Sequence, residues 1–271
     1  MNNRQLHIRL TRRGIFDRMH ILCAVLLQLH VAVSCACAQN APMLEAVESV
    51  KEPVTTVAVD TTHAGLKLYY PNFTSIDLVC GSVPSMDDER VIMFCEAAFT
   101  NELMDEFTHK NIQCSHASGG VFYDNGVWGR NNGAFVYHDG KWDFFHCDPP
   151  RASVLGAAID TAAAHGGMGF CQEMFIHEGH EVPHTRKDNS RNIFRALCSL
   201  DGQLCVAEAA VVGTFSEFID NLLAAEVTEA LYLDMGSGWN YSWYRPTEGA
   251  APVIIHPKTH SYITNWITFY Y

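Results

Sequence analysis

The chain is poor in positive charge. Its 271 residues include 18 Lys and Arg against 30 Asp and Glu, which gives a net charge of −12. Five arginines lie before residue 19, so the part that follows residue 38 has 13 basic and 29 acidic residues and a net charge of −16. Nucleic acid and anionic lipid generally bind to basic patches. We therefore expect neither as a partner, although one arginine and a few amides can still bind a phosphorylated substrate.

Motifs of metal and redox chemistry are also missing. There is no Cys-x-x-Cys pair, so a zinc ribbon or a thioredoxin-like site has no support. His177, His180 and His184 are close in sequence, but the helical HExxH spacing is absent. Glu178-Gly179 is better explained as a hairpin turn that makes His177 and His180 cross-strand neighbours. We interpret these histidines as surface residues in preference to a zinc site, and we expect no metal and no cofactor.

No apolar run after residue 38 has the length of a membrane span, and no repeat or low-complexity segment is present. Residues 1–38 are typical of a secretory signal peptide, with arginines, a short apolar run over 21–33 and Ala36-Cys37-Ala38 before Gln39. Residues 39–53 are polar and acidic, which predicts a flexible leader. We therefore expect a secreted or periplasmic protein without a transmembrane segment once the signal is removed.

Two alternatives remain open at the amino terminus. Met19 is a second possible start, because the basic region before it is long. Cys35 follows an apolar run and Ser34, so a lipid-anchored surface protein is the alternative to plain secretion.

Seven cysteines follow the signal peptide, and some could pair in an oxidising compartment. A two-residue turn at Asp201-Gly202 would place Cys198 directly opposite Cys205. That spacing permits a cross-strand disulfide, and buried thiols are an equally good interpretation.

Short apolar or alternating runs bounded by turn residues dominate the rest of the chain and are typical of strands. The runs between residues 119 and 145 are separated by Asn-Gly and Asp-Gly sequences and are expected to form consecutive hairpins. Residues 170–176 are expected to form one strand, and alanine-rich residues 157–164 a helix that Gly166-Gly167 ends. The predicted fold class is mixed α+β, with largely antiparallel sheets and two or three helices, in a single domain over residues 54–271.

Residues 192–245 carry the clearest signals. Two apolar runs flank Asp201-Gly202, which is the strongest local hairpin signal because both turn positions need a positive φ. Thr214 and Glu217 have the spacing of a capping box, and an amphipathic helical pattern follows. A short buried strand over 230–233 then leads into Asp234 and a glycine-rich loop. A carboxylate there lies beside backbone amides that a ligand can approach; the alternative is an Asp that only caps the turn.

The order of an arginine, a DG hairpin, a helix and a strand that ends in Leu-Asp-x-Gly-Ser resembles the phosphodiester glycosidase family. This family is related to the enzyme that uncovers mannose 6-phosphate by removing its N-acetylglucosamine cap. Arg195 matches the family arginine, and Asp234 matches the acid of its Leu-Asp-Gly-Gly-Gly-Ser loop. Met235 departs from the family, because a glycine is usual there, and the serine is displaced. The resemblance covers residues 91–245.

The upstream match is partial. Ala98-Phe99 stands where the family has Gly-Phe, and Glu96 replaces an Asn. Glu96 is either a catalytic carboxylate or the cap of a helix over residues 101–107. Gln172 matches a family Gln that precedes apolar residues. Arg130 lies in a loop, where it either contacts an anion or is simply exposed.

The resemblance implies a hydrolase that cleaves the glycosidic bond of a sugar-phosphate diester. In that reading Arg195 neutralises the phosphate, Asp234 is a general acid or base, and Glu96 or Glu173 is the second carboxylate that glycoside hydrolysis needs. The implied substrate-binding residues are Gly236, Ser237, Gly238, Trp239, Arg130 and Gln172. Trp239 suits stacking on a sugar face, or it packs within a strand.

Whether the chain is an enzyme stays open. The alternative is a non-catalytic secreted glycan-binding protein on the same fold, which the changes at Met235 and Glu96 favour. A weaker option is a structural surface protein without a ligand, for which Arg195 and Asp234 should lie far apart.

Overall fold

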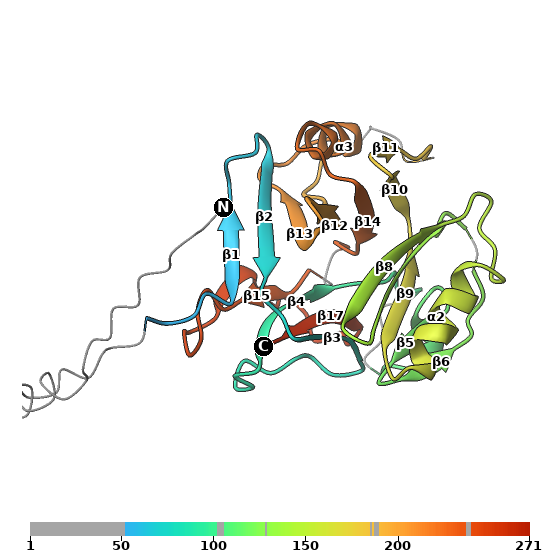
Figure 1. The fold of residues 1–271 in the computed structure, drawn as a ribbon, viewed down its shortest axis with the longest axis horizontal. Helices are drawn as coiled ribbons and strands as arrows, with labels where there is room; N and C mark the ends of the chain where they lie inside the picture. Colours follow the sequence, from blue (N-terminus) through green and yellow to red (C-terminus); the bar gives the residue numbers. More distant parts are fainter. Residues whose placement is uncertain (1–51, 102–105, 128, 185, 187–189, 237–239) are drawn as a thin grey trace, which may run out of the picture. The chain divides into compact units, whose positions relative to one another are not determined.

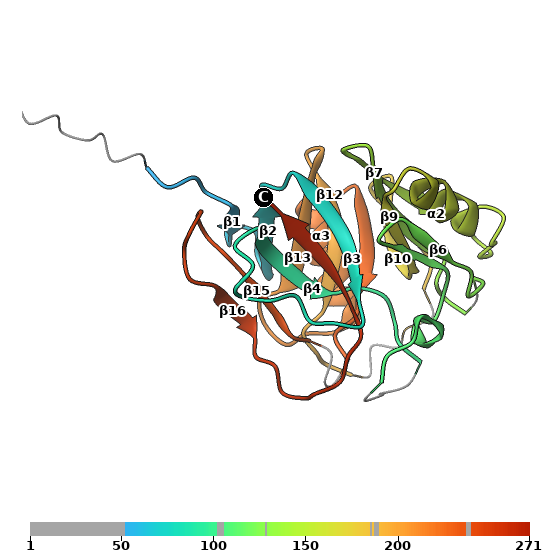
Figure 2. The ribbon, with the colours of Figure 1, turned by 90° about the horizontal axis from the view of Figure 1, so that it is seen from below.

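The structure, a computed structural model, describes residues 52–271 apart from residues 102–105, 128, 185, 187–189 and 237–239. The expected signal peptide and most of the expected leader lie outside the described residues. Pro53–Tyr271 is one compact unit. In its described part, two α-helices accompany three antiparallel sheets (Figures 1 and 2), which confirms the mixed α+β class. No described helix is both long and apolar enough to cross a membrane.

The largest sheet contains the hairpin that the DG turn predicted. Its seven strands run in the order β1 (Val57–Asp60), β2 (Leu66–Pro71), β13 (Gln203–Ala209), β12 (Arg195–Leu200), β14 (Glu229–Leu233), β10 (Met174–His177) and β11 (His180–Glu181). Asp201 and Gly202 have φ angles of 51° and 72°, as a two-residue turn of this kind requires. The turn places Cys198 opposite Cys205, and both are free thiols.

The second sheet joins segments from the two ends of the compact unit. Its five strands run in the order β16 (Val253–His256), β15 (Ser242–Tyr244), β4 (Val91–Glu96), β17 (Asn265–Tyr270) and β3 (Ser75–Cys80). The carboxyl-terminal strand β17 thus lies between β3 and β4, as Figure 2 also shows. This position explains the apolar end of the sequence, because Trp266, Ile267 and Phe269 are buried.

The third sheet corrects two expectations about strand pairing. Its order is β6 (Val121–Tyr123), β5 (His116–Ser118), β9 (Met168–Gln172), β7 (Gly133–His138) and β8 (Lys141–His146). β7 and β8 form the expected hairpin, but β6 pairs with β5, and β9 separates the two pairs. The strand expected over 170–176 is also divided, because β9 belongs to this sheet and β10 to the largest one. Glu173 lies at the break, and a short 3-10 helix, η1 (His109–Asn111), precedes β5.

Each α-helix covers one sheet (Figure 1). α3 (Phe215–Ala224) packs Phe218, Ile219 and Leu222 against the apolar face of the largest sheet. The predicted capping box begins it: Thr214 Oγ1 accepts from the Glu217 amide at 3.1 Å, and the Glu217 side chain accepts from the Thr214 amide at 2.8 Å. α2 (Leu155–Ala164) covers the third sheet and ends before Gly166, as its sequence predicted.

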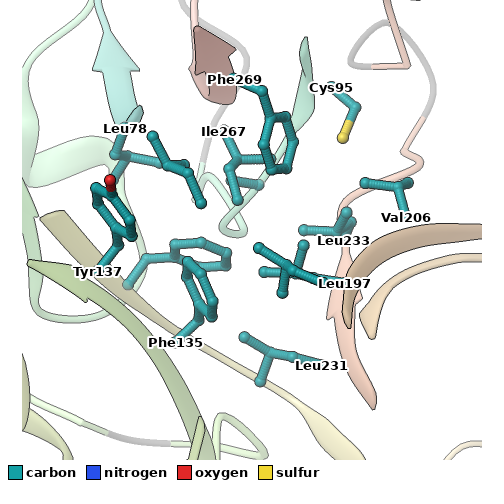
Figure 3. Close-up of a cluster of buried hydrophobic side chains, with 14 of the residues drawn as sticks. Leu78, Cys95, Phe135, Tyr137, Leu197, Val206, Leu231, Leu233, Ile267 and Phe269 are labelled. Atoms are coloured by element: carbon teal, nitrogen blue, oxygen red, sulfur yellow. The ribbon is translucent and has the colours of Figure 1, made fainter. Parts of the chain in front are cut away.

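The main core lies between the three sheets. Figure 3 shows side chains from all of them pointing toward one another, among them Leu78, Phe135, Leu197, Leu231 and Phe269. The approach is close enough to exclude a side chain at Gly133, where an added Cβ would lie 2.6 Å from Met174 Cβ. Burial of this shared core is therefore what holds the ends of β4, β9 and β14 at one place.

Candidate active site

Three chain segments from different sheets meet at the carbonyl of Ala97. This residue follows β4, and its oxygen accepts a bond of 3.1 Å from the Asp234 amide at the end of β14. The same oxygen accepts from the Gln172 side-chain amide at the end of β9, at 3.2 Å. Glu96, Gln172 and Asp234, which are far apart in sequence, are therefore close together at this junction.

Glu173 brings a second carboxylate to the junction. Its carbonyl accepts from the Tyr232 amide at 2.9 Å, two residues before Asp234. Its side chain is 2% exposed and binds Arg186, with Nε 2.7 Å from Oε2. Arg130 Nε is 3.6 Å from the same oxygen. The other oxygen, Oε1, is buried and has no hydrogen-bond partner among the described residues.

Arg186 is a site residue that the sequence analysis missed. Its guanidinium carbon lies 4.2 Å from the centre of the Tyr232 ring and 4.9 Å from that of Phe215, so cation–π attraction to two rings adds to the Glu173 pair. Its Nη2 is buried without a hydrogen-bond partner in the described structure. In sequence it lies in a polar loop with no motif, so no local signal identified it.

An open pocket of about 510 Å³ reaches Glu173. It is lined by Gly129, Arg130, Asn132, Asp148, Pro150, Glu173, Pro183 and His184. His184 Nδ1 is buried there without a hydrogen-bond partner among the described residues, as is Glu173 Oε1. Two lining residues, Glu173 and His184, thus have a buried polar atom without a partner in the described part of the chain. Such an atom lowers stability unless a ligand bonds to it, so the pocket suits a hydroxyl-rich or anionic ligand.

Asp234 is placed to exchange a proton near neutral pH. It is 6% exposed, and burial raises its pKa to about 6, although the Gly236 amide and the Arg186 charge act in the opposite direction. Gly236 N–H donates to Oδ1 at 3.0 Å, so this predicted binding residue serves to hold the carboxylate. The other predicted loop residues, Ser237, Gly238 and Trp239, lie outside the described residues.

Glu96 lies deeper, at the end of β4. Burial raises the pKa of this carboxyl well above its usual range, and the nearby negative charge of Asp234 acts in the same direction against the opposing charge of Arg195. Trp266 Nε1 donates to Oε1 at 3.3 Å, and Oε2 lies 3.6 Å from Arg195 Nη1. Burial therefore favours the protonated form of Glu96.

Arg195 is enclosed by the protein rather than open to a ligand. Its backbone lies opposite Leu233 on β14, one residue before Asp234, so the two residues are not far apart, contrary to what the structural-protein alternative expected. However, only 1% of Arg195 is exposed. Its Nη2 donates to Glu208 Oε2 at 2.8 Å and to Ser242 Oγ at 2.9 Å.

Glu208 is the principal partner of Arg195. Burial opposes its charge, but Arg195 and His256 outweigh burial and lower its pKa to about 2. A signal for this pair exists in the sequence: Arg195 is six positions before Asp201, and Glu208 is six positions after Gly202. A two-residue DG turn makes these residues opposite partners, and the register confirms it.

His177, His180 and His184 are neighbours in sequence but do not form one cluster in the structure. His177 and His180 are cross-strand partners of β10 and β11, which confirms the hairpin interpretation. His177 Nδ1 lies 2.9 Å from Glu229 Oε2, and His184 faces the pocket. Within the described residues, the groups whose geometry could hold a metal ion include none of the three.

Comparison with known proteins supports the fold that the sequence suggested. No family model matches the chain, and no curated protein matches it in sequence. Among solved structures, it is similar to the zebrafish N-acetylglucosamine-1-phosphodiester alpha-N-acetylglucosaminidase catalytic domain, auto-inhibited by its pro-peptide, with 13% identity and a TM-score of 0.50 over 86% of this chain and 85% of that one. A hypothetical protein from Synechocystis gives 12% identity and a TM-score of 0.43 over 78% of this chain and 61% of that one. The chain therefore shares its fold with a glycosidase catalytic domain.

Proposed function

We propose that the chain is an exported hydrolase that cleaves the glycosidic bond of a sugar-phosphate diester. The observation that carries this proposal is the meeting of Glu173, Arg186 and Asp234 at one sheet junction, beside a pocket of about 510 Å³. The shared fold with a phosphodiester glycosidase catalytic domain supports the same reaction class. Export rests on the signal-peptide pattern of residues 1–38.

Binding of the phosphate falls to Arg130 and Arg186 in this proposal. Arg130 is half exposed at the pocket, and Arg186 has a buried donor without a partner. Two guanidinium groups can hold a phosphodiester anion by charge-assisted bonds. Arg195, which the family resemblance implies for this role, is already bonded to Glu208 and Ser242. We assign it instead to positioning Glu96.

Asp234 is the general base of the proposed reaction. Its pKa of about 6 leaves it ionised at pH 7 while it remains a useful proton acceptor. It takes a proton from water, the water oxygen bonds to the anomeric carbon, and the bond from that carbon to the phosphate oxygen breaks. The electron pair leaves with a phosphomonoester, which as a good leaving group needs little protonation. Glu173 stabilises the positive charge that develops on the sugar.

A non-catalytic glycan-binding protein is the second candidate. The observation that favours it is the enclosure of the acids, because Glu96, Glu173 and Asp234 are all buried and each is bonded within the protein. Met235, which stands where the phosphodiester glycosidase family has a glycine, also favours this candidate.

The test is release of free sugar from a sugar-1-phosphodiester by the purified full chain. We expect turnover that rises with pH through about 6 and then levels, and a loss of about 100-fold or more in kcat for Asp234→Asn. Asp201→Asn is the matched control, because it makes the same chemical change in a hairpin turn, where Asn also tolerates the positive φ. Glycan binding without turnover in the wild-type protein would establish the second candidate instead.

A further inference from the structure

A cluster of Cys80, His109 and His116 lies outside the candidate active site, and neither the family resemblance nor the proposed reaction uses it. One potential ligand atom from each of the three lies within 4.8 Å of the others. Cys80 ends β3, His109 begins η1, and His116 begins β5. Three neighbouring elements therefore bring one thiol and two imidazoles to the same point.

The orientation of His116 is that of a metal ligand. Its ring is fully buried, and Nδ1 lies 3.2 Å from the Cys114 carbonyl, which can only accept. Nδ1 must therefore carry the proton, and the lone pair of Nε2 points into the cluster. Ligating histidines usually have their other ring nitrogen held by a carbonyl in this way.

The surroundings hold the cluster together from two sides. Tyr123 is the cross-strand partner of His116, and its ring stacks on His109 with centres 3.5 Å apart and planes within 7°. Ser118 Oγ donates to the Leu78 carbonyl at 2.7 Å, which ties β5 to the strand that carries Cys80. The three side chains therefore need only small movements to bind one ion.

The distances fit a small tetrahedral ion. With zinc–nitrogen bonds of about 2.0 Å and zinc–sulfur bonds of about 2.3 Å, ligand atoms lie about 3.3 to 3.6 Å apart. His109 Nδ1 and His116 Nε2 are 2.9 Å apart, so they must separate by a few tenths of an ångström. One thiolate and two imidazoles are borderline-soft donors that suit Zn²⁺ and disfavour Ca²⁺ and Mg²⁺.

We propose that Cys80, His109 and His116 form a Zn²⁺ site, with the fourth position left to water or a small ligand. Binding releases the thiol proton of Cys80 to solvent, and the proton that His109 Nδ1 shares with His116 Nε2 is transferred to His109 Nε2, so that both imidazoles bind the ion in their neutral form. The ion ties β3, η1 and β5 together. This site is independent of the proposed hydrolase activity.

A second cluster supplies the matched control. His138, Asp139 and His165 also have metal-like spacing, but they are more exposed, and Asp139 Oδ2 already bonds both histidines at 3.1 and 2.8 Å. His138→Gln removes a ligand there and leaves the proposed site intact.

The experiment titrates the purified, chelator-treated full chain with Co²⁺ and then with Zn²⁺. We expect one equivalent of tetrahedral Co²⁺ with a thiolate-to-metal charge-transfer band, which Zn²⁺ removes. Cys80→Ser should abolish the charge-transfer band, and His116→Gln should weaken binding by more than about 100-fold. His138→Gln should change neither. Absence of the band in the wild-type protein, or its persistence in Cys80→Ser, would overturn the proposal.

A second measurement uses the wild-type protein and therefore does not depend on the folding of any variant. Alkylation of Cys80 is followed by mass spectrometry of its peptide, with and without Zn²⁺. Zn²⁺ should slow this alkylation by about tenfold or more at saturation, because the coordinated thiolate is withdrawn from reaction. An unchanged rate at Cys80 would contradict the site directly.

Discussion

Asp234 and Glu208 are two buried carboxyl groups on the same sheet whose environments differ. Burial raises the pKa of Asp234 to about 6. Glu208 is as deeply placed, but contact with Arg195 and His256 lowers its pKa to about 2. In the proposed reaction, this difference suits Asp234 to proton exchange, whereas Glu208 keeps its negative charge beside Arg195.

Asp234→Asn should stabilise the protein above pH 7, although we expect it to remove the proposed activity. The pKa is 3.8 without burial and about 6 in the folded protein, so the folded state binds more protons between these values. This contribution to stability is complete below pH 3.8 and is lost as the pH rises through 6. Since about 2 units correspond to about 3 kcal/mol, urea unfolding should show a gain of that order at pH 7.5 and little gain at pH 4.

The outcome that contradicts this is an equal change at both pH values. Such a result would mean that the carboxyl titrates alike in the folded and unfolded chain, and it would remove the reason to assign Asp234 as the base.

Arg195→Met should reduce the free energy of unfolding by about 3 to 5 kcal/mol, because it leaves Glu208 buried without its main counter-ion. The double change with Glu208→Leu should recover part of the loss, since no unpaired charge then remains. Urea unfolding measures both variants. A loss below about 1 kcal/mol together with failure to bind substrate would instead return Arg195 to the phosphate-binding role that the resemblance implies.

Some residues of the candidate site could be identified from the sequence and others could not. Asp234 follows a recognisable strand and precedes glycines, and Glu208 follows from the symmetry of a DG hairpin. Arg186 has no such signal, because its partners are Glu173, at the break between β9 and β10, and Tyr232, on β14. Its importance depends on contacts that no local pattern encodes.

At the scale of elements, the capping box at the start of α3 can be tested by substitution. Thr214→Ala removes the oxygen that accepts from the Glu217 amide at 3.1 Å and should cost about 1 kcal/mol of stability. Thr214→Ser keeps that oxygen and is the control. Urea unfolding compares the two variants, and an equal loss in both would show that the methyl group, rather than the cap, supplies the stability.

The β12–β13 and β7–β8 hairpins were predictable, but the pairing of β6 with β5 and the division between β9 and β10 were not. The DG turn determines the pairing of β12 with β13, because both its residues adopt positive φ. Residues 170–176 instead have apolar residues on both sides of Gln172-Glu173, a pattern that is compatible with one strand or two. The break at Glu173 arises because the two halves pair in different sheets.

At the scale of the whole molecule, Gly133 tests the contact between sheets. An alanine Cβ there would lie 2.6 Å from Met174 Cβ and 2.8 Å from Leu231 Cδ1, so Gly133→Ala should cost about 1 to 3 kcal/mol through overpacking. Gly156 is the control: in α2 an added Cβ meets only Ala152 Cβ, at 3.8 Å. Gly156→Ala should stabilise by up to about 1 kcal/mol. Unfolding curves for both variants measure the difference, and loss of stability at Gly156 alone would contradict it.

The same contact explains how the candidate active site is built. Gly133 pairs with Gln172, the last residue before Glu173, so the close approach of the sheets also sets the position of the acids. Substitutions at this contact are therefore expected to act on stability and on the site together.

Short-range sequence patterns were enough to predict the α+β class, the DG hairpin, the capped helix and the strand that ends at Asp234. These features depend on residues that are only a few positions apart. Packing of three sheets on one core settled the rest. It enclosed Arg195, brought Arg186 to Glu173, and collected Cys80, His109 and His116. Those contacts join distant segments, and only burial of a shared apolar core brings such segments together.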